Sequence, residues 1–167
     1  MTMYTVGDKL LYGTMGIIEI CEVTDQTVND VTKKYYVLKE YGSNMSSYTY
    51  VPCDNEALVS QLKPLLTRKE AEKLIKNADK VEPLSWDDDS RRRADKYKSI
   101  IASGDREGMI AMIKSIQLMR QKRIDDGKKN YIADENSMRR VHKLLVTELS
   151  ISLGVGEDDV PTLFEDI

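Results

Sequence analysis

The residues that most often build catalytic or metal centres are scarce in this sequence. Its 167 residues include one histidine and two cysteines. Cys21 and Cys53 lie far apart and form no C-x-x-C pair, so we interpret them as small buried hydrophobic residues in a reducing compartment. His142 lies within a helical pattern without a ligand-like neighbour, which argues against a metal site.

Short catalytic motifs and long apolar runs are missing as well. There is no G-x-S-x-G motif, no phosphate-binding loop and no dinucleotide fingerprint. We therefore expect no enzyme, no cofactor and no metal. No apolar run is long enough to span a bilayer, and the start MTMYTVGDKL lacks the pattern of a signal peptide. The expected protein is cytoplasmic and has no membrane contact.

Charge is small in total but uneven along the chain. The net charge is −3, which does not favour a protein that binds nucleic acid unaided. Residues 91–143 hold 15 basic and 7 acidic residues, whereas residues 144–167 hold 6 acidic residues and no Lys or Arg. A basic middle in an acidic chain indicates a positive face that acts after another partner has positioned it.

The first part of the chain has the composition of short strands. The runs MYTVGDKLLY, GIIEICEVTD, KKYYVLKEY and SYTYVPC are rich in Tyr, Val, Ile and Thr. Gly13, Gly16 and the segments DQTVND and YGSNMS supply turn chemistry between them. This spacing predicts a small SH3/Tudor-like antiparallel β-barrel. Pro52 cannot donate a ladder hydrogen bond, so its strand is an edge or ends there.

The second part has helical periodicity. Thr67 and Glu70 form a capping box, Pro83 stops a helix, and Asp105 caps another. Met109, Met112, Met119 and Met138 are interpreted as core filler between helices. The predicted helices cover residues 67–76, 88–101, 105–127, 134–153 and 158–165. The fold class is therefore α+β, with a β-domain at residues 1–60 and an all-α helical domain at residues 61–167.

Several segments, taken in order, resemble the CarD/CdnL family of bacterial transcription regulators. They are YTVGDKLLYGTMGIIEI, YYVLKEY, YTYVPCDN, the lone Trp86 followed by RRR and ASGD, and LLVTELSISLG. The resemblance implies that the barrel is a Tudor-like domain that docks on the β subunit of RNA polymerase by pairing of an edge strand. The residues implied in this contact are Lys33, Lys34, Tyr48, Thr49, Tyr50, Val51 and Pro52. Some relatives have a basic residue where this chain has Tyr50.

The same resemblance implies a promoter contact by the helical domain. Trp86 is implied to wedge into the minor groove at the upstream edge of the transcription bubble and to stabilise the open complex. Phosphate contacts that read no sequence are implied for Arg91, Arg92, Arg93, Lys96 and Lys98. The protein is then nucleoid-associated through the polymerase, as a monomer or a weak homodimer.

The residues alone leave other interpretations open. A lone Trp is commonly a packing residue, and the acidic tail GEDDVPTLFEDI favours a protein–protein adaptor on RNA polymerase without direct DNA contact. Asp87, Asp88 and Asp89 either begin a helix, where negative charge is favourable, or repel phosphate. The basic residues at 120, 122, 123, 128 and 129 are either solvated surface or a second phosphate contact.

Overall fold

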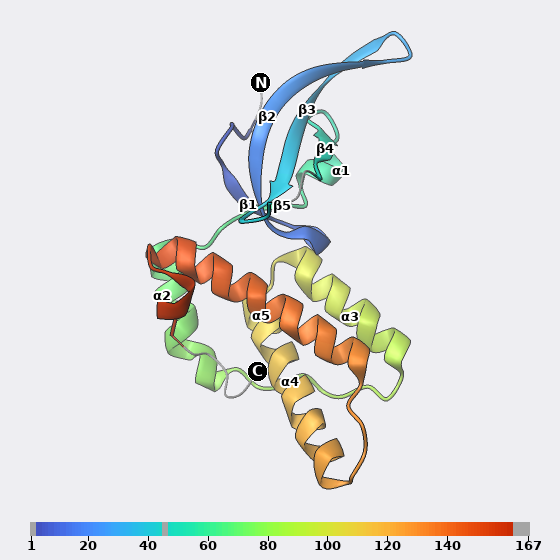
Figure 1. The fold of residues 1–167 in the computed structure, drawn as a ribbon, viewed down its shortest axis with the longest axis vertical. Helices are drawn as coiled ribbons and strands as arrows, with labels where there is room; N and C mark the ends of the chain where they lie inside the picture. Colours follow the sequence, from blue (N-terminus) through green and yellow to red (C-terminus); the bar gives the residue numbers. More distant parts are fainter. Residues whose placement is uncertain (1–2, 45–46, 162–167) are drawn as a thin grey trace. The chain divides into compact units, whose positions relative to one another are not determined.

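The computed structural model describes residues 3–44 and 47–161 (Figure 1). The chain divides into two compact units, Met1–Leu65 and Leu66–Ile167. The first contains the strands and the second contains the long helices, which confirms the α+β class. No helix among the described residues is long and apolar enough to cross a membrane.

The first unit is one antiparallel sheet of five strands in the order β4-β3-β2-β1-β5. The strands are β1 (Lys9–Tyr12), β2 (Gly16–Val28), β3 (Val31–Glu40), β4 (Thr49–Pro52) and β5 (Leu62–Pro64), with the short helices η1 (Gly13–Met15) and α1 (Glu56–Val59). β4 and β5 are the two edges and do not pair with each other, so the sheet stays open. The five-stranded antiparallel sheet followed by helices agrees with the predicted fold class, and the edge position inferred from Pro52 is confirmed.

Curvature lets one face of this open sheet enclose a core. Ile18, Ile20, Tyr36 and Leu38 are fully or almost fully buried there. The ladder between β2 and β3 shifts register between Ile20 and Glu22. Such a bulge reverses the alternation of side chains, so Val23 packs on the core although it lies three residues after Ile20. Cys21, inside the bulge, is exposed, and its predicted burial is wrong.

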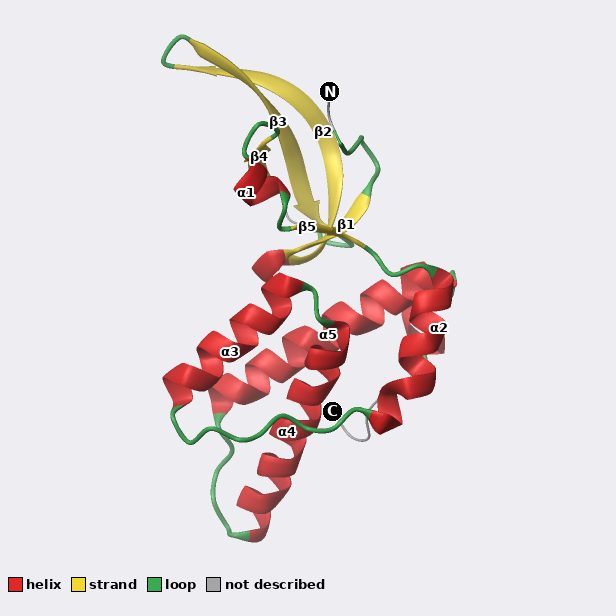
Figure 2. Cartoon of the chain, turned by 180° about the vertical axis from the view of Figure 1, so that it is seen from behind, coloured by secondary structure: helices red, strands yellow, loops and turns green. Residues whose placement is uncertain are grey.

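β2 and β3 form a hairpin that extends well beyond the other strands (Figure 2). The segment DQTVND was expected to be a turn, but its first four residues continue β2. The turn is Asn29-Asp30 alone, with φ of 51° and 61°. Asn and Asp tolerate this left-handed conformation, and a two-residue turn of this kind matches the twist of the strands.

The second unit contains the helices α2 (Arg68–Asn77), α3 (Ser90–Ser103), α4 (Arg106–Asp125) and α5 (Ile132–Leu153), with single turns η2 (Ala78–Lys80) and η3 (Glu157–Asp159). The capping box of Thr67 and Glu70 is confirmed, and so is the cap by Asp105. α3 begins two residues later than predicted, because Asp89 serves as its N-cap. Of the predicted helix 158–165, only the first residues belong to a described turn, and residues 162–165 lie outside the described residues.

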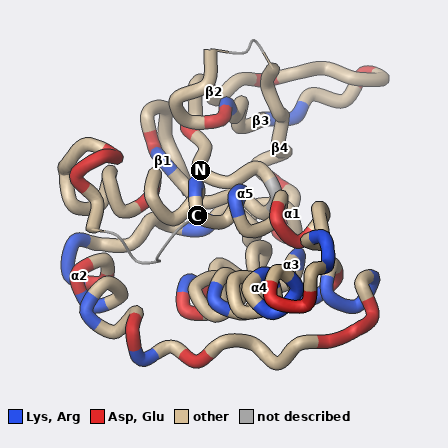
Figure 3. Tube along the Cα trace, turned by 60° about the horizontal axis from the view of Figure 1, so that its bottom comes forward, with Lys and Arg blue, Asp and Glu red and all other residues tan. Residues whose placement is uncertain are grey.

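The core between α4 and α5 is apolar but is braced by ion pairs. Met109, Met112 and Met138 are fully buried, as predicted, while Met119 is half-buried. Three arginines from α3 and α4 pair with three carboxylates of α5. These pairs are Arg93–Asp134, Arg106–Glu148 and Arg120–Glu135. Along the backbone of this unit, Lys and Arg positions are interspersed with Asp and Glu positions (Figure 3).

Candidate functional site

The outer edge of β4 has main-chain groups that its own sheet leaves unused. The Cys53 N–H donates to the Lys34 carbonyl at 2.9 Å, and Val51 lies opposite Tyr36. Hydrogen-bonded pairs alternate along an antiparallel ladder, so the N–H and C=O of Tyr50 point away from β3. Pro52 also falls on the outward set, where its missing N–H costs the sheet nothing. A partner strand can therefore pair with this edge.

The side chains near β4 divide into exposed and buried ones. Tyr48 and Tyr50 are 50% and 47% exposed, and the Tyr50 ring packs edge-on against Tyr35 at 6.4 Å. Lys33 and Lys34 are also exposed and pair with Asp54 at 3.0 Å and Asp25 at 3.5 Å. Thr49 and Pro52 are half-buried.

The side chain of Val51 is not available for the predicted polymerase contact. It is 1% exposed and belongs to the core of the sheet. Its main chain also faces β3 and not the outer edge. The alternation of side chains along a strand accounts for this, since Tyr50 and Val51 must point to opposite faces.

Trp86 lies in the segment between η2 and α3, where an aromatic ring and a cation contact its indole. It is half-buried. Its ring stacks on that of Tyr131, with centroids 5.8 Å apart and planes at 26°, and the guanidinium carbon of Arg93 lies 4.2 Å from its centroid. The Leu84 N–H donates to the Ala111 carbonyl at 3.2 Å, which ties the segment to α4. The indole is thus neither buried in the core nor fully exposed. It is held in place by its neighbours and is partly accessible to solvent.

Arg93 is buried and saturated with acceptors. It is 3% exposed, and its guanidinium donates to both carboxylate oxygens of Asp134 at 3.0 and 2.9 Å. It also donates to the carbonyls of Asp87 at 2.9 Å and Asp88 at 3.2 Å. The hydrogen bonds with Asp134 raise the pKa of Arg93 above its ordinary value. The predicted phosphate contact by Arg93 therefore does not fit this structure. Instead, the Arg93 guanidinium packs against the indole of Trp86.

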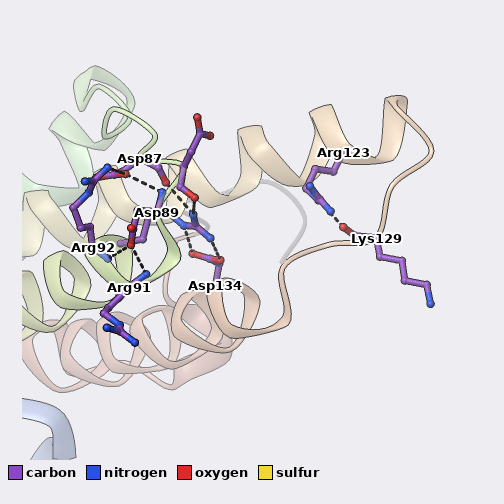
Figure 4. Close-up of polar contacts among 9 residues, drawn as sticks. Asp87, Asp89, Arg91, Arg92, Arg123, Lys129 and Asp134 are labelled. Atoms are coloured by element: carbon purple, nitrogen blue, oxygen red, sulfur yellow. Dashed lines mark hydrogen bonds and ion pairs between the residues drawn. The ribbon is translucent and has the colours of Figure 1, made fainter.

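The three aspartates after Trp86 have separate roles (Figure 4). Asp87 accepts from the Arg92 guanidinium at 2.8 and 2.9 Å, and this pairing, with the Asp89 N–H, lowers the pKa of Asp87 to about 2. Asp89 accepts from the N–H groups of Arg91 and Arg92, which confirms the cap. Asp88 is exposed. Two of the three carboxylates are thus engaged within the protein, which reduces the repulsion that a phosphate would meet.

The remaining predicted DNA residues lie on the surface of α3. Arg91, Lys96 and Lys98 are exposed, and no carboxylate in the described ranges lies within ion-pair distance of them. Arg92 is exposed too, but its charge is balanced by Asp87. Three of the five predicted cations are therefore available to a phosphate backbone.

Residues 4–63 match the family model of the CarD-like/TRCF RID domain. After this match we call the N-terminal unit the RID domain. The match covers nearly all of this unit and none of the helical unit. It is consistent with the predicted membership of the CarD-like family. None of the curated proteins compared matches the chain.

The match to the RID domain supports the interpretation that this is a transcription-related protein that interacts with RNA polymerase. The family that it matches is one of protein-interaction domains. Within the described residues there is no group of three or more His, Cys, Asp or Glu side chains that could hold a metal ion. The exposed edge of β4 is a feature of the RID domain itself, since residues 49–52 lie inside the matched segment.

Sequence reasoning missed Tyr131 as the stacking partner of Trp86. The two are far apart in the sequence, and Tyr131 reaches Trp86 because the α4–α5 turn returns to the segment that precedes α3. The burial of Arg93 was also missed, although a signal was present. Arg93, Tyr97 and Ile101 recur every four residues, which places them on one face of α3.

Proposed function

We propose that the RID domain docks on the β subunit of RNA polymerase through the edge of β4, and that the helical unit stabilises the promoter open complex. In this proposal Trp86 enters the minor groove at the upstream edge of the bubble. The observation that carries it is the lone tryptophan, half-exposed and in contact with the Arg93 guanidinium and the Tyr131 ring, which also contact each other. The resemblance of the helical segments to the CarD/CdnL family supports this proposal. In this proposal the protein acts in the cytoplasm, at the nucleoid.

The held indole suits a wedge for an energetic reason. Unstacking a base step costs a few kcal/mol, and a side chain that is already ordered loses little further entropy on insertion. Arg91, Lys96 and Lys98 would add phosphate contacts that fix the register without reading sequence. Docking on the polymerase raises the effective concentration of these weak contacts near DNA.

Trp86→Ala is expected to abolish most of the gain in open-complex lifetime while leaving the affinity for polymerase unchanged. A base–aromatic stack is worth ~1–3 kcal/mol, so the lifetime should fall about five-fold or more. The measurement is dissociation of a promoter complex under competitor, with wild type, Trp86→Ala, Trp86→Phe and no factor. We expect Trp86→Phe to retain part of the gain. An alanine variant that prolongs the lifetime as wild type does would identify a polymerase adaptor without DNA contact.

Tyr50→Pro is expected to weaken docking on polymerase more than Tyr50→Ala does. Proline removes the outward N–H of β4, whereas alanine removes only the side chain. A lost hydrogen bond of ~0.5–1.5 kcal/mol lowers the affinity by about two- to ten-fold. Because that N–H is not part of the β3–β4 ladder, the circular dichroism spectrum should stay that of wild type. Equal affinities of the two variants would argue against pairing through this edge.

A further inference from the structure

The α4–α5 turn, residues 126–131, is fastened directly to the Trp86 site. Tyr131 stacks on Trp86, and the Arg123 guanidinium carbon lies 4.0 Å from the centroid of the Tyr131 ring. The same guanidinium donates to the carbonyl of Lys129. The Lys128 N–H donates to the Arg123 carbonyl at 2.8 Å. The end of α4 therefore fixes the main chain of the turn, and the aromatic stack fixes the turn relative to Trp86.

The side chains of this turn point positive charge outward. Lys128 and Lys129 are exposed, and no described carboxylate lies within ion-pair distance of either ammonium group. Figure 4 shows the Lys129 side chain directed away from the helices while its carbonyl is held by Arg123. Asp125 precedes the turn and accepts a hydrogen bond from Gln121 at 2.9 Å, and Asp126 is the first residue of the turn.

The position of the turn relative to α3 suggests a particular role. In Figure 4, Arg91 and Lys129 lie on opposite sides of Asp134, the residue that holds Arg93 against Trp86. The minor groove is ≈ 6 Å wide, so an inserted ring has a phosphate backbone on each side. Cations on one side of the ring contact the strand that is nearer to them. A wedge is held more firmly when cations on both sides of it contact the two strands.

We propose that the α4–α5 turn is a second DNA-contacting element, in which Lys128 and Lys129 contact the phosphates of the strand across the groove from α3. Tyr131 couples this element to Trp86 and acts as a positioning residue. The inference rests on the proposed promoter contact and adds to it a set of residues and a strand assignment. These contacts read no sequence, because they go to phosphate oxygens.

Charge removal tests the phosphate contact. We expect the double variant Lys128→Gln/Lys129→Gln to shorten the open-complex lifetime and to reduce the slope of log lifetime against log salt by up to about two, since each phosphate contact contributes about one to such a slope. The matched control is Lys69→Gln/Lys73→Gln, which removes two exposed charges from α2. It should keep the wild-type lifetime and slope. If both double variants behave alike, the inference is overturned.

The outcome is separable from that of the proposed function. If Trp86→Ala loses the lifetime gain and Lys128→Gln/Lys129→Gln keeps it in full, the wedge stands and the second element is wrong. If wild-type protein itself does not prolong the lifetime, the promoter contact fails and this inference fails with it.

Crosslinking tests the strand assignment. Lys129→Cys and Arg91→Cys, each in a Cys21→Ser/Cys53→Ser background, would carry a photo-crosslinking group into a polymerase–promoter complex. We expect position 129 and position 91 to crosslink to opposite DNA strands near the upstream edge of the bubble. Crosslinks from both positions to the same strand, or from position 129 to polymerase alone, would overturn the inference.

Discussion

Arg93→Met is expected to destabilise the helical unit by ~3–5 kcal/mol, because it leaves Asp134 buried without its counter-charge. Asp134 is 6% exposed, and Arg93 supplies two hydrogen bonds to its carboxylate. The same guanidinium also ties the carbonyls of Asp87 and Asp88 to α5. The measurement is urea unfolding followed by circular dichroism at the helix band. A midpoint equal to that of wild type would contradict the prediction.

Two further variants separate the ion pair from other causes. Arg91→Met removes an exposed arginine of the same helix, and its effect should stay within ~0.5 kcal/mol. Arg93→Met/Asp134→Leu replaces the whole pair with apolar side chains. It should recover much of the loss, because no buried charge then remains without a partner. A double variant no more stable than Arg93→Met would show that shape and hydrogen bonding at this position matter more than the charge.

Loss of Arg93 should also be visible at Trp86. The guanidinium covers one face of the indole, and Tyr131 stacks with the same ring. Without the cation, the indole should become more accessible to acrylamide quenching under conditions in which the helical unit is still folded. The Arg93–Asp134 ion pair and the indole of Trp86 are thus linked through a single side chain.

Local signals in the sequence determined the elements well. The capping box at Thr67 and the caps at Asp89 and Asp105 rest on side chains only a few residues from the groups they satisfy. The edge position of β4 followed from Pro52, since proline cannot donate to a ladder. The match of residues 4–63 supports what the ordered motifs of the first unit implied.

The errors arose where distant contacts decide the structure. The order of the strands in the sheet, with β4 and β5 at its edges, depends on contacts between distant segments, which no local pattern reports. The turn DQTVND contains turn-forming residues, but pairing with β3 keeps most of it extended. Three consecutive arginines look alike in a sequence, yet a helix rotates successive side chains so far that Arg93 alone faces the bundle.

Leu38→Ala is expected to destabilise the RID domain by ~2–5 kcal/mol, the usual cost of truncating a fully buried leucine. Leu38 is 0% exposed and lies in β3, which pairs with both β2 and β4. The variant should lose affinity for polymerase, because the edge of β4 exists only when the sheet is folded. Val28→Ala, at the exposed end of the hairpin, should change neither stability nor affinity appreciably.

The helical unit should not share the effect of Leu38→Ala. The two units are separate compact bodies in the contact pattern, and Leu38 belongs to the core of the sheet. The emission of Trp86 should therefore stay that of wild type, while the gain in open-complex lifetime is lost. Residues 67–167 hold 20 basic and 20 acidic residues, so this unit has no net charge to draw it to DNA unaided. A Leu38→Ala protein that still prolonged the lifetime would mean that the wedge needs no tether, and the charge argument for docking would fail.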